Sequence, residues 1–387
     1  MVLFCQISTN LINSHRNGLS THYYQKIWEM RELDGYQKPD DFWEIPNWVA
    51  ILRHNIKEAD FTIVRNVDDF VRFLNASNYH YVCFSVLEAN KHLIREIIEK
   101  YTGNATFALG GYIDLERYFG GYDNVATFET LKHFSALVMG RFTHGYNYSD
   151  FRNNKCIPRL TLSTGCHNRC RFCSVKKTVE VVQHDEIAQQ IKSFKDLDFK
   201  LVYLNDKTFG QSRNFSQLPR FLDRVREDND DFKGTIIQTT PRAFLRLSDN
   251  FLRDAQIKFV ELGIESYNDH ILGAYRKPSR TKDIDEATDR FRHIDAQLIP
   301  NIIIGFPEET KESYQETLRY IERNQDVVSH MNIYNLAIYQ QAEIASKVKA
   351  EANDLNELVL EKSFHKDKEA HRWFYDEIFG LGLEILK

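Results

Sequence analysis

The sequence predicts an α/β fold of two successive parallel sheets: an N-terminal, Rossmann-like open sheet, then a partial (β/α)6 barrel, with a C-terminal helical segment. Short apolar runs alternate with helix-spaced apolar positions along most of the 387 residues. Several runs are almost wholly apolar, as in strands buried on both faces. A second alternating series starts at Pro158. We therefore expect domains at residues 1–145, 146–340 and 341–387.

Five apolar runs are the expected strands of the first sheet. They are Val2–Ile7, Phe61–Val64, Tyr81–Val86, Ala105–Leu109 and Ala136–Met139. Helical spacing lies between them, through Tyr24 to Leu33, Val67 to Leu74 and Leu93 to Ile98. The stretch Asp34–Asn47 fits no βα unit and is expected to be an insertion.

Six further runs are the expected strands of the barrel. They are Arg159–Leu162, Leu201–Leu204, Thr235–Gln238, Phe259–Leu262, Ile299–Ile304 and Met331–Leu336. The helices between them are expected at Ile187–Phe194, Leu218–Val225, Ile284–Ile294 and Ser313–Ile321. In such a barrel the chemistry lies at the carboxyl ends of the strands.

The composition restricts the class of protein. Hydrophobic residues make up 42% of the chain and charged residues 27%, which is typical of a folded globular protein. The net charge of −5 indicates no broad nucleic-acid surface, and the apolar runs are too short to span a membrane. The first residues have no basic region or cleavage site, so we expect no secretory signal and a cytoplasmic protein.

Four of the six cysteines lie within eighteen residues. Cys166, Cys170 and Cys173 have the spacing Cys-x3-Cys-x2-Cys, directly after the first barrel strand, where three thiolates can converge on one point. Three thiolates are one ligand short of a closed structural zinc site or a fully ligated four-iron cluster. His167 could complete a zinc set, so a structural or sensor protein is the alternative that is not an enzyme.

This loop resembles the signature of the radical S-adenosylmethionine (SAM) superfamily, which has an aromatic residue, here Phe172, before the last cysteine. The resemblance implies that the three cysteines hold three irons of a [4Fe-4S] cluster, and that the fourth iron binds SAM. It also implies that one electron from the cluster, supplied by a donor such as flavodoxin or ferredoxin, generates a 5′-deoxyadenosyl radical.

Segments after later strands carry the same resemblance. Glu265 and Ser266 occupy the place of the ribose-binding segment, and Gly305 and Glu308 the place of the adenine-contacting segment. The glycine-glycine-glutamate that holds the methionine amine in many members is absent. Asn205 or Asp206 is expected to replace it, and Arg242 is a candidate substrate contact.

Each segment also has a structural alternative. Glu265 could cap the following helix, Gly305 could serve only a strand-to-helix turn, and Asp206 could pair with Lys207 or Arg242.

The N-terminal sheet resembles the cobalamin-binding domain that precedes the barrel in one branch of the superfamily. There the backbone near the paired glycines, here Gly110 and Gly111, passes close to the cofactor. The loop from Asn13 to Gly18 echoes the family's Asp-x-His-x-x-Gly pattern, with Asn13 in place of aspartate. A solvated loop histidine is the alternative to His15 as a cobalt ligand. Arg141 stands where an acidic residue is common, so the domain could keep the fold without the cofactor.

A competing resemblance is to the methylthiotransferases, whose N-terminal domain holds a second cluster and needs three more clustered thiolates. Only Cys5 and Cys83 lie in this domain, and they are expected to be packing residues. We therefore expect a cobalamin-dependent C-methyltransferase or an enzyme of a related radical transformation, with a cobalamin-free or methylthiotransferase-like radical SAM enzyme as the alternative. Whether the enzyme is a transferase or a lyase or isomerase stays open. The substrate class, whether small molecule, peptide or nucleotide, stays open.

Overall fold

The computed structural model describes residues 1–15, 45–87, 89–111, 113–152, 155–328, 330–336, 342–346, 350–352, 358–360, 368–381 and 384–386. The chain divides into two compact units. The first comprises Met1–Pro158 and Ala188–Phe199, and the second comprises Arg159–Ile187 and Lys200–Lys387.

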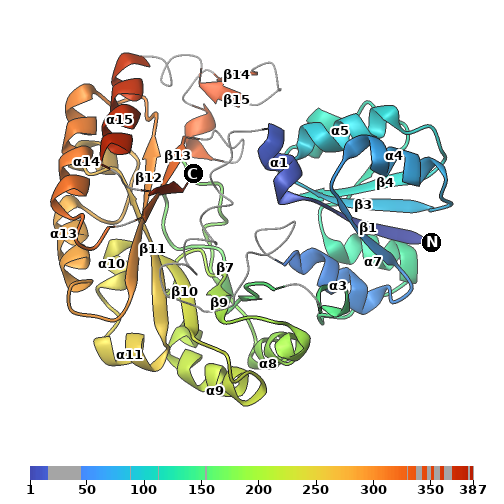
Figure 1. Ribbon diagram of the computed structural model, residues 1–387, viewed down its shortest axis with the longest axis horizontal. Coiled ribbons are helices and arrows are strands. Elements are labelled where there is room, and N and C mark those ends of the chain that lie inside the picture. The colour runs from blue at the N-terminus through green and yellow to red at the C-terminus, as the bar shows by residue number, and fades with distance from the viewer. Residues whose placement is uncertain are drawn as a thin grey trace. The chain divides into compact units, whose positions relative to one another are not determined.

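The first unit is a five-stranded parallel sheet in the order β2-β1-β3-β4-β5 (Figure 1). Its strands are β1 (Val2–Ile7), β2 (Asp60–Val64), β3 (Tyr81–Val86), β4 (Thr106–Gly111) and β5 (Val125–Thr127). Its helices are α1 (Thr9–His15), α3 (Asn47–Asn55), α4 (Val67–Asn75), α5 (Lys91–Lys100), α6 (Leu115–Phe119) and α7 (Leu131–Met139), with a 3-10 turn at Ser149–Phe151. Helices α4 and α5 cover one face of the sheet, and α3 and α7 cover the other (Figure 1).

The fold of this unit follows from its sequence pattern. In α4 the Asn66 side chain caps the first turn by accepting from the Asp69 N–H at 3.0 Å, and an apolar stripe from Val67 to Leu74 packs on the sheet. The buried strand residues Leu3, Val82 and Phe107 belong to the same core. Four of the five strands expected from the sequence are therefore confirmed.

The expected strand Ala136–Met139 is wrong, because these residues form the last turn of α7. The Thr130 hydroxyl accepts from the His133 N–H at 3.2 Å and starts the helix, and Gly140 ends it at φ 69°. The fifth strand is instead β5, a three-residue segment that is half-buried and carries no apolar run.

Two expected segments fall wholly or largely outside the described residues. The helical spacing from Tyr24 to Leu33 lies outside them, as does the expected insertion up to residue 44, including Trp43. The described part resumes at Ile45, and α3 begins at Asn47.

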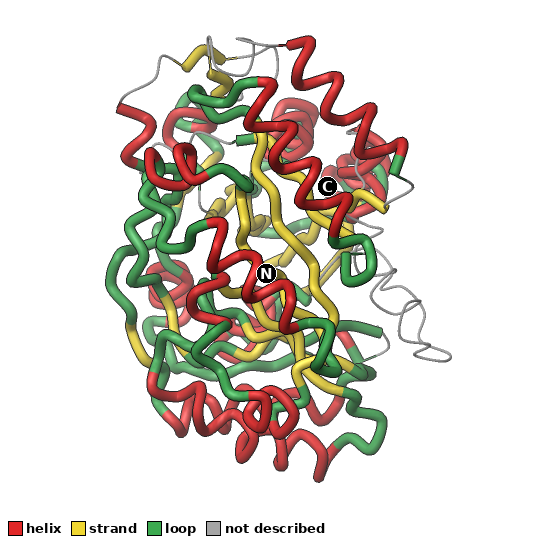
Figure 2. Tube along the Cα trace, turned by 90° about the vertical axis from the view of Figure 1, so that its left-hand side faces the viewer, coloured by secondary structure: helices red, strands yellow, loops and turns green. Residues whose placement is uncertain are grey.

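The second unit is a seven-stranded sheet in the order β16-β13-β12-β11-β10-β9-β6, with every recorded pairing parallel (Figures 1 and 2). Its strands are β6 (Arg159–Leu160), β9 (Leu201–Leu204), β10 (Gly234–Thr239), β11 (Ile257–Glu265), β12 (Gln297–Ile304), β13 (His330–Asn335) and β16 (Glu384–Leu386). Two small antiparallel pairs accompany it: β7 (Ser163–Thr164) with β8 (Glu180–Val181), and β14 (Ala350–Ala352) with β15 (Leu358–Leu360).

Helices cover the outer face of this sheet (Figure 1). The helices of this unit are α9 (Leu218–Asp228), α10 (Pro241–Phe244), α11 (Asp249–Asp254), α12 (Asp269–Ala274), α13 (Thr281–Arg290), α14 (Lys311–Arg323) and α15 (Lys368–Gly380), with 3-10 turns at Arg213–Gln217 and Glu343–Ser346. Helix α8 (His184–Ser193) starts in the second unit, and its end and the 3-10 turn Phe194–Asp196 belong to the first.

All six expected barrel strands are present, although β6 is shorter than expected. The expectation that the C-terminal segment is helical holds for α15 and for the 3-10 turn Glu343–Ser346, and it is wrong for β14, β15 and β16. Strand β16 extends the sheet by pairing with β13, and β14 and β15 form an antiparallel pair. These strands have only three residues each, too few for a period to emerge from the sequence.

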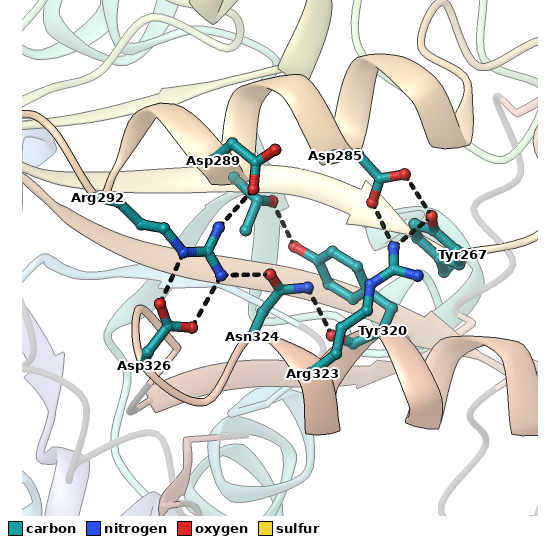
Figure 3. A network of polar contacts seen from close by, with 9 residues as sticks. Tyr267, Asp285, Asp289, Arg292, Tyr320, Arg323, Asn324 and Asp326 are labelled. Atoms are coloured by element: carbon teal, nitrogen blue, oxygen red, sulfur yellow. Dashed lines mark hydrogen bonds and ion pairs between the residues drawn. The ribbon is translucent and has the colours of Figure 1, made fainter.

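A polar network joins α13 to α14 (Figure 3). The Arg292 guanidinium donates to both carboxylate oxygens of Asp326, at 2.7 and 2.9 Å, and to Asn324 at 2.9 Å. Asn324 in turn donates to the Tyr320 carbonyl at 2.8 Å. The buried hydroxyls of Thr288 and Tyr320 lie 2.8 Å apart, so the network continues into the core.

Among the described residues, no helix is both long and apolar enough to cross a membrane.

Candidate functional site

The cysteine loop follows β7 at the carboxyl end of the first barrel strand. Gly165 has φ 77°, and a Cβ there would lie 1.8 Å from the Thr178 carbonyl oxygen, so only glycine fits. The Gln211 amide holds this turn, since it donates to the Gly165 carbonyl at 2.9 Å and accepts from the His167 N–H at 3.2 Å. The start of the loop is therefore fixed before any ligand binds.

Backbone and hydroxyl groups surround two of the cysteine sulfurs. The Asn168 N–H lies 3.4 Å from Cys166 Sγ, and the Val175 N–H lies 3.4 Å from Cys173 Sγ. The buried Thr208 hydroxyl is 3.3 Å from Cys166 Sγ. Groups that donate to thiolate sulfur favour the charged form that a cluster requires.

Burial raises the pKa of Cys170 to about 11, and the Lys277 ammonium opposes this rise. The charges of Cys173 and Cys166 raise the pKa of Cys170 further. Within the described residues, however, no three His, Cys, Asp or Glu side chains are grouped as ligands of one metal ion. The assignment of Cys166, Cys170 and Cys173 as the ligands of a cluster therefore stays a prediction. A four-iron cluster binds each cysteine on a different iron.

His167, the fourth zinc ligand of the alternative hypothesis, is exposed. Phe172 is half-buried and packs against Phe306 and Tyr275, with ring centroids 5.7 and 6.4 Å away. The loop thus joins an apolar cluster that also contains Ile271 and Leu336.

Glu265 ends β11 and is buried, with a left-handed backbone at φ 66°. Its carboxylate is ion-paired with the buried Lys277 ammonium. Burial alone would lower the pKa of Lys277, but the charges of Glu265 and Cys170 and the hydrogen bond to Glu265 outweigh it and raise the pKa. The helix-cap alternative for Glu265 is wrong, because Asn268 caps α12 by accepting from the Ile271 N–H at 3.0 Å.

Ser266 follows Glu265 and is 1% exposed. Its hydroxyl is buried and has no hydrogen-bond partner in the described part of the chain. An orphaned buried hydroxyl costs free energy. A ligand hydroxyl next to Glu265 would satisfy it, so this pair fits a ribose.

Gly305 has φ 92° directly after β12. The Glu309 carboxylate accepts from the Gly305 N–H at 2.6 Å and from the Phe306 N–H at 2.9 Å, and burial raises the pKa of Glu309 to about 8. The expectation that Gly305 lies in a strand-to-helix turn is therefore confirmed. Glu308 is exposed and accepts a hydrogen bond from the Tyr275 hydroxyl.

Asn205 and Asp206 follow β9, and their side chains have different partners. Asp206 is buried and accepts from the Leu162 N–H at 3.0 Å and from the Ser163 hydroxyl, so pairing with Lys207 or Arg242 is not its main contact. Burial raises the pKa of Asp206 to about 6, opposed by these hydrogen bonds. Asn205 accepts from Arg159 at 3.0 Å. The Arg242 side chain is exposed.

The first unit has a cavity of about 290 Å³ at the carboxyl ends of β3 and β4. Gly110 lines it, and a Cβ there would meet only the Phe128 carbonyl oxygen, at 3.5 Å. Gly111 also lines the cavity, and a Cβ there would lie 2.1 Å from the Val86 carbonyl oxygen, so only glycine fits. Trp48 also lines the cavity, packs edge-on against Phe4, and has a buried indole N–H without a partner in the described residues.

The remaining cysteines are buried thiols. Cys5 and Cys83 lie on adjacent strands of the first sheet, and burial raises the pKa of both. Burial also raises the pKa of Cys156, which contacts the Asp198 carbonyl at 3.8 Å. The side chains of Asn13 and His15, and the residues from Arg16 to Gly18, lie outside the described residues.

Residues 160–321 match the family model of the Radical SAM superfamily. The second unit, with its partial barrel and its cysteine loop, is thus a radical SAM domain. The ribosomal protein uS12 methylthiotransferase RimO of Thermosipho melanesiensis is 24% identical over 187 residues, covering 46% of this chain and 44% of the relative. The tRNA-2-methylthio-N(6)-dimethylallyladenosine synthase of Bifidobacterium adolescentis is 29% identical over 201 residues, covering 48% and 41%. The chain spans about half the length of the curated relatives it matches.

Two solved structures have the two-unit fold. The radical SAM methyltransferase TsrM from Kitasatospora setae, with cobalamin and a [4Fe-4S] cluster bound, has a TM-score of 0.62 at 12% identity, covering 90% of this chain and 77% of that chain. The cobalamin-dependent radical SAM enzyme OxsB with aqua-cobalamin bound has a TM-score of 0.62 at 12% identity, covering 98% and 67%. The N-terminal parallel sheet followed by a partial barrel is therefore the fold of cobalamin-binding radical SAM structures.

Sequence reasoning missed three residues of the site. Lys277 and Glu309 contact predicted residues, and Thr208 contacts a predicted cysteine. The roles of Glu265, Ser266, Gly305, Glu308, Asn205 and Asp206 toward SAM stay predictions, as do those of Gly110 and Gly111 toward cobalamin.

Proposed function

We propose that the chain is a cobalamin-dependent radical SAM methyltransferase that methylates a carbon atom of its substrate. The cavity beside Gly110 carries this proposal. It lies at the carboxyl ends of β3 and β4, where open parallel sheets bind cofactors. Its volume is at the lower end of the range for small-molecule sites, so it suits one part of a cobalamin. The unpartnered Trp48 N–H offers that part a hydrogen bond.

In the second unit, Cys166, Cys170 and Cys173 would hold the four-iron cluster. The cluster, when bound, supplies the electron that cleaves SAM, and we propose flavodoxin or ferredoxin as its source. Glu265 and Ser266 would orient the ribose, and the apolar group of Phe172, Tyr275 and Phe306 would exclude water beside the cysteine loop. Cobalamin, when bound in the first unit, supplies the methyl group.

Methylthio transfer is the second candidate, favoured by the similarity to RimO and to the tRNA methylthiotransferases. A second cluster in the first unit would need thiolates there. The two cysteines of its sheet are buried, and burial raises the pKa of both, which favours the neutral thiol. This chemistry supports the methyltransferase over the methylthiotransferase.

The test is cobalamin uptake by the reconstituted full chain. Gly110→Leu places a side chain in the cavity without a backbone clash, and we expect it to block retention of corrin after incubation with hydroxocobalamin and desalting. Gly121→Leu is the matched control, because no atom lies within 4 Å of its Cβ position. Wild-type protein that retains no corrin, or equal retention by the Gly110→Leu variant, would contradict the proposal.

A further inference from the structure

The loop that follows β9 reaches the cysteine loop at two points. The Gln211 amide bonds to the backbone on both sides of Cys166, and the Thr208 hydroxyl lies 3.3 Å from Cys166 Sγ. Cys166 and Thr208 are both buried, with exposed fractions of 7% and 5%. The hydroxyl and the sulfur therefore contact each other away from bulk water.

Thr208 is fixed in this position by the residue that follows it. The Phe209 N–H donates to the Gln238 carbonyl at 2.8 Å, and the Phe209 carbonyl accepts from the Thr239 hydroxyl at 2.9 Å. The Phe209 ring is buried and stacks on Phe251, with ring centroids 6.1 Å apart. Strand β10 thus anchors the backbone beside Thr208, and the hydroxyl is held at the sulfur before any cluster binds.

The hydroxyl is the donor in this contact once Cys166 binds iron. A cysteine that ligates a metal is a thiolate, which has no proton to give. In the described part of the chain, the Thr208 hydroxyl has one acceptor, Cys166 Sγ, and its other polar neighbour, the Asn168 side-chain amide at 3.5 Å, is a donor. The proton of the hydroxyl is therefore directed to the sulfur.

The donors around the sulfurs of Cys166 and Cys173 differ. Cys166 Sγ contacts the Thr208 hydroxyl and the Asn168 N–H, the latter at 3.4 Å. Cys173 Sγ contacts the Val175 N–H at 3.4 Å. Of these three donors, the Thr208 hydroxyl alone belongs to a side chain, and it comes from outside the cysteine loop. It is therefore the one that a substitution can remove without changing the loop.

A hydrogen bond to a ligating sulfur changes the energetics of electron transfer. Reduction adds one negative charge to the cluster and its thiolates, and a hydrogen bond stabilises the more negative state more strongly. We propose that Thr208 is a positioning residue that raises the reduction potential of the cluster by donating to the Cys166 thiolate. One electron enters from the flavodoxin or ferredoxin proposed above, and the Thr208 O–H bond stays intact. The inference rests on the part of the proposed function that places a cluster at the three cysteines.

The experiment measures the reduction potential of the reconstituted full chain by an anaerobic redox titration followed by electron paramagnetic resonance. Thr208→Val and Thr208→Ala remove the hydroxyl, and Thr208→Ser keeps it. Thr164→Val is the matched control, because the Thr164 side chain is exposed two residues before Cys166. Iron content, corrin uptake and urea unfolding of the cluster-free chain are measured for each variant, so that a loss of cluster or of fold is distinguished from a shift in potential.

We expect Thr208→Val and Thr208→Ala to keep the wild-type iron content and to lower the potential by about 59 mV, a tenfold shift in the one-electron equilibrium. Thr208→Ser and Thr164→Val should keep the wild-type potential.

An unchanged potential in the Val and Ala variants, or an equal shift in Thr208→Ser, would overturn the inference. Loss of the cluster from both variants with folding intact would also overturn it, because Thr208 would then serve to hold the cluster. Wild-type protein that binds no cluster would contradict this inference and the proposed function together. The expected shift in a chain that takes up no corrin would contradict the proposed function alone.

Discussion

Glu265 and Lys277 form a buried ion pair at the predicted ribose site. The neighbouring backbone leaves space for both side chains. Their side chains are 11% and 5% exposed. Gly263 makes room for them, because a Cβ there would lie 2.8 Å from Glu265 Oε1 and 3.0 Å from Lys277 Nζ. Glu265 also has a left-handed backbone, which costs about 1–3 kcal/mol in a residue other than glycine. A carboxylate held at such a cost is expected to serve a ligand.

The first prediction concerns this pair. Lys277→Met should lower the free energy of unfolding by about 3–5 kcal/mol, because it leaves the Glu265 carboxylate buried without its partner. The double variant Glu265→Gln with Lys277→Met should recover part of this loss, since no buried charge then remains. Urea unfolding of the cluster-free chain measures both effects. A double variant less stable than Lys277→Met would show that the pair does not act as one unit.

SAM affinity separates the role of Glu265 from its contribution to stability. Glu265→Gln should weaken SAM binding to the reconstituted chain by about 1.5–3 kcal/mol, the value of a hydrogen bond to a charged group. Iron content should stay at the wild-type level. Unchanged affinity would mean that Glu265 serves only the ion pair with Lys277.

The second prediction concerns the cluster. Cys166→Ala, Cys170→Ala and Cys173→Ala should each abolish the iron and the thiolate-to-iron absorption of reconstituted protein, because two thiolates do not hold the cluster. Cys5→Ala and Cys83→Ala are the matched controls, since both thiols are buried in the first sheet. A halved iron content in either control would indicate a second cluster and favour methylthio transfer.

At the residue scale, the sequence could predict groups that belong to a motif but not their partners. The cysteine spacing and the residues after β11 and β12 are local patterns. Lys277 stands twelve residues after Glu265, and only the fold brings its ammonium to the carboxylate. Likewise, nothing in the order of residues 305 to 309 distinguishes the exposed Glu308 from Glu309, which accepts from two backbone N–H groups.

At the scale of elements, apolar runs predicted strands well where the run was long or buried on both faces. The run Ala136–Met139 was ambiguous, because four apolar residues fit a strand or a helix turn equally. The signals that decide it lie outside the run, in the Thr130 cap and in Gly140 at φ 69°. Strand β5 escaped prediction because its three residues are only half-buried or exposed.

The third prediction is at this scale and tests the contact between α13 and α14. Thr288→Val and Tyr320→Phe should each lower the free energy of unfolding by about 1–3 kcal/mol. The first leaves the buried Tyr320 hydroxyl without this partner, and the second leaves the buried Thr288 hydroxyl without it. The double variant should lose less than the sum of the two single losses, since the hydroxyls bond to each other. Urea unfolding measures the cycle, and strict additivity would show that the hydroxyls act independently.

For the whole molecule, the two-unit architecture could be predicted because each sheet repeats one local pattern. The residues of the inner face of the second sheet could not be predicted, since this face depends on which strands are neighbours.

Burial raises the pKa of two described carboxyl groups of the second unit, that of Asp206 to about 6 and that of Glu309 to about 8. A carboxyl group whose pKa is raised on folding stabilises the fold below its unfolded pKa, and this contribution is lost as pH rises through the folded pKa.

The fourth prediction follows from this sign. The free energy of unfolding of the wild-type chain should fall between about pH 4.5 and 8 through Glu309, by up to about 1.4 kcal/mol per pH unit. Glu309→Gln keeps an acceptor for the Gly305 and Phe306 N–H groups and removes the titration. Its stability relative to wild type should therefore rise with pH, and the Asp206 titration, which both proteins share, cancels in this comparison. Urea unfolding at pH 5, 6.5 and 8 measures the difference, with Glu322→Gln on the exposed face of α14 as the control. A constant difference between Glu309→Gln and wild type across this range would show that the Glu309 carboxylate is already ionised in the folded chain at pH 5.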